Sequence, residues 1–243
     1  MTAAILSSTI RAGTGGGVMS VQIKYKLVFE GGDADYYRLP AHEGASSLEG
    51  LTWSVALVTN YAATGEIRSR GSLSPRIRTY LRPPRQGSFL TELWVMVTQP
   101  ESIFLTSVIG VYAVNSVSQA VNALIVKSVK EVCGLAVNMT KKEEDWLKGL
   151  PSGDLEALVD KIEPSMKRAH NIIGEGASTI TIKKGYTPLV ALDHITKAYV
   201  NADLRGDEKT RSVSVGAFNA NTGNGRVYLP DVGKTVLLIS AEI

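Results

Sequence analysis

The chain has 243 residues, of which 44% are hydrophobic and 20% are charged, and its formal net charge is +3. These values are ordinary for a globular protein of one large domain or two small ones, and so low a net charge gives no whole-chain argument for nucleic-acid binding. The one cysteine, Cys133, excludes an internal disulfide and favours a reducing cytoplasm as the compartment.

The pattern of elements predicts an α+β fold, with an N-terminal antiparallel sheet and long helices, a central helical region and a small C-terminal β module. Residues 1–18 hold only a short apolar run followed by glycines, so they are interpreted as a disordered tail and not as a secretory signal. We expect a sheet-and-helix domain over residues 19–100, a mainly helical region over 101–205 and the β module over 206–243.

The first predicted domain opens with a strand at Val21–Phe29, where apolar residues alternate. A turn rich in Gly and Asp leads to a returning strand at Tyr36–Leu39. Apolar residues at helical spacing then predict a long helix at Ser46–Ile67. Arg76–Leu81 and Ser88–Thr98 are expected to form a hairpin, because the proline-rich segment between them favours a turn.

The stretch from residue 102 to 126 contains no charged side chain and follows Pro100, a favourable residue for the first turn of a helix. A helix of this length could span a bilayer. Two interpretations stay open. The segment is a buried central helix rich in small residues, or it inserts into a membrane, where helix interfaces also favour small residues.

The second half of the chain begins with a charged segment, Thr140–Leu147, and an amphipathic helix at Asp154–Ile173. A short strand is expected at Thr179–Ile182, followed by a helix at Pro188–Val200 that Thr187 caps. Three strands are predicted to end the chain, at Ser212–Phe218, Arg226–Leu229 and Thr235–Ser240.

A possible phosphate-binding motif lies near the end, where Gly233, Lys234 and Thr235 match the last three residues of a phosphate-binding loop. That loop needs another glycine five positions before Gly233, where the chain has Tyr228. It also needs a helix after Thr235, where an apolar, β-branched run predicts a strand. The three residues are therefore interpreted as part of a turn between two strands.

The end of the chain, residues 214–238, resembles the first strands of a cold-shock or related OB-type barrel. The shared features are a glycine, a Phe-Asn strand end, a Thr-Gly-x-Gly turn and an apolar strand. The resemblance implies a surface on which bases stack, with Phe218 and Tyr228 as aromatic candidates. Asn224 and Arg226 occupy places where such domains carry aromatic residues, so a β wall used for packing or protein contact is the alternative.

The whole chain is also similar to uncharacterised bacterial proteins of this length. The residues that carry this similarity are Ser47–Gly50, at the entry to a helix, and Asn219–Tyr228, near the end. The similarity implies no particular activity.

Arginines gather between residues 68 and 85, with no acidic residue among them. In a strand over residues 76–82, alternate side chains share a face, which places three arginines and a tyrosine together. Arginine binds phosphate in a fork and tyrosine stacks on bases, so this face is predicted to bind nucleic acid or another polyanion. The alternative is a solvated face whose arginines pair with Asp33, Asp35 or Glu92. The candidate binding residues are Arg68, Arg70, Arg76, Arg78, Tyr80, Arg82 and Arg85, together with Phe218, Arg226 and Tyr228.

Metal and catalytic chemistry have weaker support. Asp33 and Asp35 lie in one turn, and hard cations take such oxygen ligands, but paired carboxylates in turns are common without a metal. None of the three histidines has zinc spacing with Cys133. No metal site, cofactor or catalytic residue is therefore predicted. The histidines are His42, His170 and His194.

The predicted function is a non-enzymatic binding protein for nucleic acid or another polyanion, with a protein partner or a homo-oligomer also expected. The alternative is a membrane-directed or oligomerising bacterial effector, either a toxin or an antiviral protein, that uses the uncharged segment 102–126 beside the basic patch. An enzyme ranks last, because no activated nucleophile or metal set can be named around the nearby carboxylates. Those carboxylates are Asp33, Asp35, Glu43 and Glu49.

Overall fold

The computed structural model describes residues 20–68, 72–82, 90–110, 113–202, 210–219, 224–230 and 234–239. The chain divides into two compact units, and the division falls after Asn201. Each unit has its own antiparallel sheet, and six α-helices lie in the described part of the first unit. The predicted α+β class is confirmed.

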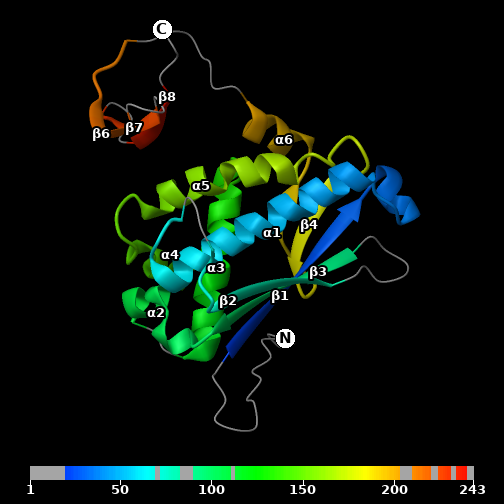
Figure 1. Ribbon diagram of the computed structural model, residues 1–243, viewed down its shortest axis with the longest axis horizontal. Coiled ribbons are helices and arrows are strands. Elements are labelled where there is room, and N and C mark those ends of the chain that lie inside the picture. The colour runs from blue at the N-terminus through cyan, green and yellow to red at the C-terminus, as the bar shows by residue number, and fades with distance from the viewer. Residues whose placement is uncertain are drawn as a thin grey trace. The chain divides into compact units, whose positions relative to one another are not determined.

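The first unit is built on a five-stranded antiparallel sheet in the order β2-β3-β1-β4-β5 (Figure 1). The central strand, β1, pairs with β3 on one side and with β4 on the other. The sheet therefore joins residues from both sides of the expected boundary between residues 100 and 101, because β4 and β5 complete the sheet of β1. The strands are β1 (Ser20–Glu30), β2 (Ile77–Arg82), β3 (Leu90–Thr98), β4 (Thr179–Lys184) and β5 (Thr187–Leu192).

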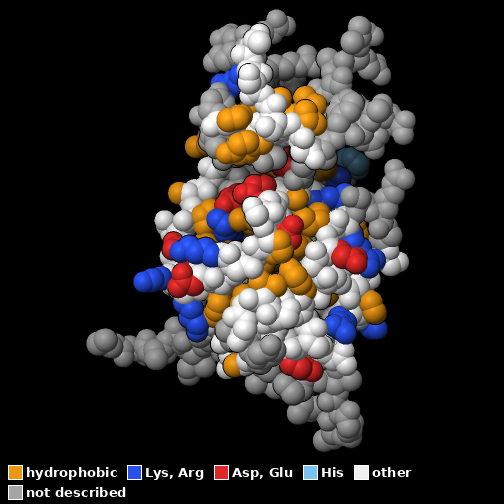
Figure 2. Space-filling view, turned by 90° about the vertical axis from the view of Figure 1, so that its left-hand side faces the viewer, with side chains coloured by type: hydrophobic (Ala, Val, Ile, Leu, Met, Phe, Trp, Pro, Cys, Tyr) orange, Lys and Arg blue, Asp and Glu red, His pale blue; other side chains and the backbone are white. Residues whose placement is uncertain are grey.

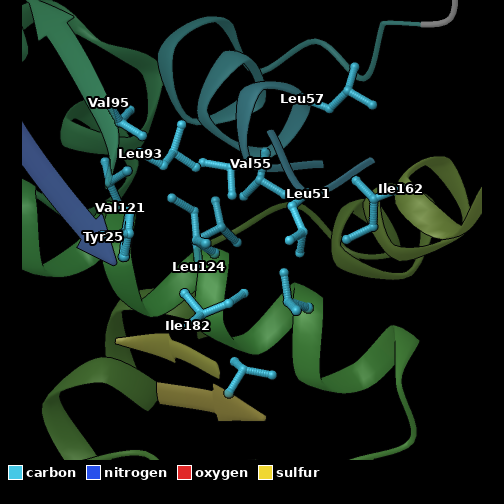
Figure 3. Close-up of a cluster of buried hydrophobic side chains, with 14 of the residues drawn as sticks. Tyr25, Leu51, Val55, Leu57, Leu93, Val95, Val121, Leu124, Ile162 and Ile182 are labelled. Carbon is cyan, nitrogen blue, oxygen red and sulfur yellow. The ribbon is translucent and has the colours of Figure 1, made fainter. Parts of the chain in front are cut away.

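The helices of the first unit cover one face of this sheet, and the hydrophobic core lies between the two layers. Alternate side chains of β1 and β3 point into the core, including Tyr25 and Leu93, which are almost fully buried. Figure 3 shows both in one cluster of buried side chains with Leu51 of α1 and Leu124 of α3. The helices are α1 (Ala41–Thr64), α2 (Phe104–Ile109), α3 (Val114–Val132), α4 (Lys141–Lys148), α5 (Asp154–Ala169) and α6 (His194–Asn201), with short 3-10 helices at Gly32–Tyr36 and Pro100–Ser102.

Helices α1 and α5 pack closely against each other. A Cβ atom at Gly50 of α1 would overlap the backbone of Ser165 and Ala169 of α5. The absent side chain lets the two helix backbones touch. Arg168 of α5 completes the contact with an ion pair to Glu49, with 2.6 Å between Nε and Oε2.

Two predicted elements beside the sheet are wrong. The segment Tyr36–Leu39 is not a returning strand, because the chain after β1 forms a 3-10 helix and enters α1 at once. The segment Pro188–Val200 is not one helix, since its first part is β5. Pro188 has no backbone N–H to donate. It is tolerated in β5 because this strand lies at the edge of the described sheet, where one side of the strand has no neighbour to pair with.

The uncharged segment is not one continuous helix. It contains α2 and most of α3, and α2 ends at Ile109, before Gly110, whose positive φ of 65° stops the helix. Apolar side chains from both helices lie in the core, among them Leu105 and Leu124 at 0% exposure. Within the described ranges, no helix has both the length and the apolar character needed to cross a membrane.

The second unit contains three antiparallel strands in the order β6-β7-β8. They are β6 (Ser214–Asn219), β7 (Asn224–Leu229) and β8 (Lys234–Ile239). A phosphate-binding loop would need a helix after Lys234, whereas this residue begins the strand β8. The described part of this unit forms a single three-stranded sheet, and the predicted resemblance to a cold-shock or OB-type barrel is not supported.

Candidate polyanion-binding sheet face

The face of the five-stranded sheet opposite the helices carries basic and aromatic side chains. The strand register places Tyr80 of β2 opposite Trp94 of β3, and Trp94 opposite Lys24 of β1. We call this surface the basic sheet face. It consists of Lys24 and Lys26 of β1, Arg78, Tyr80 and Arg82 of β2, Glu92 and Trp94 of β3, Lys183 of β4, and Tyr186 in the turn that joins β4 to β5.

One row of the basic sheet face crosses four strands and carries mostly positive charge. Arg82 lies opposite Glu92, Glu92 opposite Lys26, and Lys26 opposite Lys183. Like charges directly opposite each other in an antiparallel pair destabilise a sheet. Lys26 and Lys183 are such a pair in the register of β1 and β4.

Trp94 lies at the centre of a charged cluster on the same face. Its Nε1 donates a hydrogen bond to Oε2 of Glu92 at 3.1 Å. The Lys24 ammonium and the Arg82 guanidinium lie 4.6 and 4.7 Å from the ring centroid, within the range of cation–π attraction. Arg82 also lies 3.6 Å from Glu92, so Trp94 and Glu92 together hold two cations in place.

Tyr186 marks the end of the basic sheet face at the turn between β4 and β5. Gly185 adopts a positive φ of 63° in this turn, which brings the chain directly from Lys184 to Thr187. The Tyr186 side chain is 95% exposed, and the Lys26 ammonium lies 5.0 Å from its ring centroid. A large aromatic ring is thus held at the surface beside a cation.

The structure brings together only part of the predicted arginine cluster. Arg78, Tyr80 and Arg82 are exposed on β2, as the alternation predicts. Arg76 instead donates a hydrogen bond to the carbonyl of Ser102 at 3.0 Å. Arg68 lies in the loop after α1, where it binds the Ser72 carbonyl and pairs with Glu66. Arg70 and Arg85 lie outside the described residues.

The suggested acidic partners of these arginines are mostly occupied elsewhere. Asp33 pairs with Arg38, with 2.8 Å between Oδ1 and Nη2, and Asp35 accepts a hydrogen bond from the backbone N–H of Gly31. Glu92 pairs with one of the predicted arginines in the described part of the chain, Arg82, with 3.6 Å between Nη1 and Oε2.

The remaining predicted site residues belong to the second unit. Phe218 lies in β6 and Arg226 in β7, and their side chains are outside the described part. Tyr228 lies opposite Ser214 and Thr235 in this sheet, with its side chain 43% exposed.

Several residues of the basic sheet face were missed by the prediction from sequence. Lys24 and Lys26 occupy the positions between the buried residues of β1, so the same alternation that predicts the strand also gives their outward direction. Lys183 lies more than 150 residues after Lys26 in the chain. Its place beside Lys26 depends on the β1–β4 pairing, for which the sequence contains no local signal.

Charges on the helices are arranged differently. Figure 2 shows the side of the first unit where α2 and α4 lie in Figure 1, and acidic and basic side chains are interspersed there. Lys148 pairs with Asp145 at 3.4 Å, and Lys167 pairs with Glu163 at 2.7 Å. Within the described residues, Arg78 and Lys183 have no such carboxylate partner.

Other titratable groups serve the packing of the first unit. His170 is fully buried, with Nδ1 2.7 Å from the Met166 carbonyl and Nε2 3.0 Å from Oγ1 of Thr196. Burial raises the pKa of the Cys133 thiol to about 12, so this cysteine is a packed residue and a poor nucleophile. Across the described ranges, no three His, Cys, Asp or Glu side chains gather closely enough to hold a metal.

Comparisons with known proteins identify a family. No curated protein sequence gives a match. The chain is similar to a crystal structure of a mutant of the ferredoxin protease FusC in complex with Arabidopsis ferredoxin, at 14% identity and a TM-score of 0.24. That alignment covers 90% of this chain but only 29% of the other, and so low a score does not indicate a shared fold. The profile of a domain of unknown function, DUF7946, matches residues 25–201, more than half of the chain, and the chain therefore belongs to this family.

Proposed function

We propose that the protein binds a polyanion, and nucleic acid in particular, on the basic sheet face. The observation that carries the proposal is the direct opposition of Lys26 and Lys183 in the sheet, with no carboxylate between them. A pair of this kind reduces stability when the face is empty. A phosphate group bound between the two ammonium groups would convert the repulsion into attraction.

The composition of the whole face supports the same function. Five basic side chains and the carboxylate of Glu92 share the rows that run from Arg78 to Arg82. Glu30, which has the same orientation on β1, lies about 13 Å from Lys26 along the strand. The excess of positive charge is therefore local, although the net charge of the chain is small. Arginine adds a planar fork that matches phosphate geometry.

The alternative role at a membrane loses the feature that suggested it. That role required one long uncharged helix, whereas residues 102–126 contribute two helices with many side chains buried in the core. A folded protein could insert this segment only by giving up that core. Binding at the basic sheet face requires no such rearrangement.

The test is fluorescence anisotropy with a labelled single-stranded oligonucleotide and with labelled heparin, across a series of salt concentrations. For the wild type we expect an affinity that falls steeply with salt, because released counterions supply the binding free energy. The double variant R78E/K183E should weaken binding by about tenfold or more and reduce the salt slope by about 0.7 for each lost contact to a single strand.

A matched control is available on the helices. The double variant K148E/K167E changes the net charge by the same amount, on α4 and α5. It should keep most of the wild-type affinity if the location of the charge matters. Equal losses in both double variants, or a wild type without salt-dependent binding, would contradict the proposal.

A further inference from the structure

We infer that the ligand of the basic sheet face is single-stranded nucleic acid, whose unpaired bases stack on Tyr80 and Tyr186. This inference rests on the proposed function, and it adds a ligand class that the charges alone do not select. Charges alone would accept heparin, duplex or single strand. The two tyrosines distinguish these ligands, because only unpaired bases offer free aromatic faces.

Both tyrosine rings are exposed on the face that carries the cations. Tyr80 is 43% exposed and Tyr186 is 95% exposed, although burying an aromatic ring is normally favourable. Each ring lies close to positive charge. Tyr80 is opposite Trp94, over which Lys24 and Arg82 lie, and Tyr186 lies beside Lys26. Bases and phosphates of one strand could thus be bound together.

The two rings lie at opposite ends of a path across the sheet. Tyr80 is on the edge strand β2, and Tyr186 follows β4, with β3 and β1 between these strands. Three strand spacings correspond to about 14 Å. Lys24 and Lys26 lie between the two rings along this path. An extended strand could therefore place a base on each tyrosine and its intervening phosphates on the two lysines.

A duplex does not fit this arrangement. Its bases are already stacked inside the helix, so it would offer only phosphates to the sheet and gain nothing from exposed rings. Trp94 has a different role from the tyrosines. Its ring is partly buried and is already occupied by Lys24 and Arg82, so it positions cations and is not expected to stack on a base.

The experiment compares single strands of DNA and RNA of about 12 nucleotides with a duplex of the same sequence and with heparin, by anisotropy at fixed salt. Tyr80→Ala and Tyr186→Ala should each weaken single-strand binding by about five- to a hundredfold. Binding of the duplex and of heparin should change by less than about twofold. The ratio of the RNA and DNA affinities then identifies the preferred sugar.

Tyr36→Ala is the matched control, since Tyr36 is 75% exposed in the 3-10 helix outside the sheet. Circular dichroism checks that all variants are folded. Unchanged single-strand affinity in both sheet variants, with salt-dependent binding retained, would overturn this inference and leave polyanion binding standing. Absence of binding to every probe would overturn both.

Discussion

Tyr61 of α1 donates a hydrogen bond to the Asp154 carboxylate at 2.7 Å, which joins the last turns of α1 to the first turn of α5. The Tyr61 ring is fully buried and meets Phe104 edge to face, with 5.6 Å between ring centroids. Burial raises the pKa of this tyrosine, and the nearby Asp154 carboxylate raises it further. Tyr61 therefore remains a hydrogen-bond donor at any physiological pH.

Tyr61→Phe removes this hydrogen bond and keeps the ring. We expect the free energy of unfolding to fall by about 1 to 2 kcal/mol, because the hydrogen bond to a charged group is lost while water can still reach Asp154. Urea denaturation followed by circular dichroism measures the change. Tyr36→Phe, at an exposed ring, serves as the control, and equal stability of the two variants would contradict the expected role of the hydrogen bond.

Gly50→Ala should be among the most destabilising single-methyl changes in the protein. The new Cβ would overlap the backbone of Ser165 and Ala169, so α1 and α5 would have to separate. Overpacking of this kind costs about 1 to 3 kcal/mol, and here the obstruction is backbone that cannot rotate away. The measurement is the midpoint of thermal or urea unfolding.

The control for Gly50→Ala is Thr52→Ala on the same helix. The Thr52 hydroxyl donates to carbonyls of its own helix, at Leu48 and Glu49. Its removal should change stability by less than about 0.5 kcal/mol. A Gly50 variant as stable as the Thr52 variant would show that the two helices can move apart without cost.

His170 should make the stability of the protein depend on pH. Burial lowers its pKa in the folded state, and the charge of Lys197 lowers it further, although the Met166 carbonyl acts in the opposite direction. The unfolded chain has an ordinary histidine pKa of about 6.5 and binds the proton more readily. Stability is therefore highest above about pH 6.5 and falls as the pH decreases below it.

Urea unfolding at about pH 7.5 and about pH 5.5 measures this loss. In His170→Gln the difference between the two pH values should become smaller, because the titrating group is gone. The variant itself will be less stable at both pH values. An undiminished pH dependence in the variant would assign the effect to other residues.

Cys133 should report on unfolding. It is 2% exposed and its pKa is raised to about 12 by burial, so very little thiolate exists near neutral pH in the folded protein. We expect slow reaction with a disulfide reagent in buffer and rapid reaction in denaturing urea. Fast labelling of the native protein would mean that the end of α3 opens readily.

The element pattern of the sequence predicted much of the sheet. Alternation predicted β1, and the proline-rich loop predicted the β2–β3 hairpin, because both signals are local. The helix expected over Pro188–Val200 failed for a physical reason. Pro188 suggested a first helical turn, but the Asp193 carboxylate accepts hydrogen bonds from the N–H groups of Ile195 and Thr196, and the helix begins there.

The candidate site was only half visible in the sequence. Arg78, Tyr80 and Arg82 lie within one strand, so their shared face follows from a period of two. Lys26 and Lys183 meet through a pairing of strands more than 150 residues apart, which no local pattern specifies. The uncharged segment misled in the opposite way. Its composition is compatible with a membrane helix. In the structure α2 stops before Gly110, and side chains of both α2 and α3 are buried in the core.

Glu92→Gln should strengthen polyanion binding. Glu92 is the acidic member of the basic sheet face. Its Oε2 lies 3.6 Å from Arg82 and accepts a hydrogen bond from Trp94. A neutral amide keeps an acceptor for Trp94 and frees Arg82 for phosphate. We expect the affinity for a labelled single strand to rise by about three- to tenfold at low salt, with a steeper salt slope.

The control is Glu144→Gln on α4, which makes the same change in net charge and should leave the affinity within about twofold of wild type. Weaker binding in Glu92→Gln would contradict this expectation. It would mean that the carboxylate is needed to hold Arg82 in the position from which it binds phosphate.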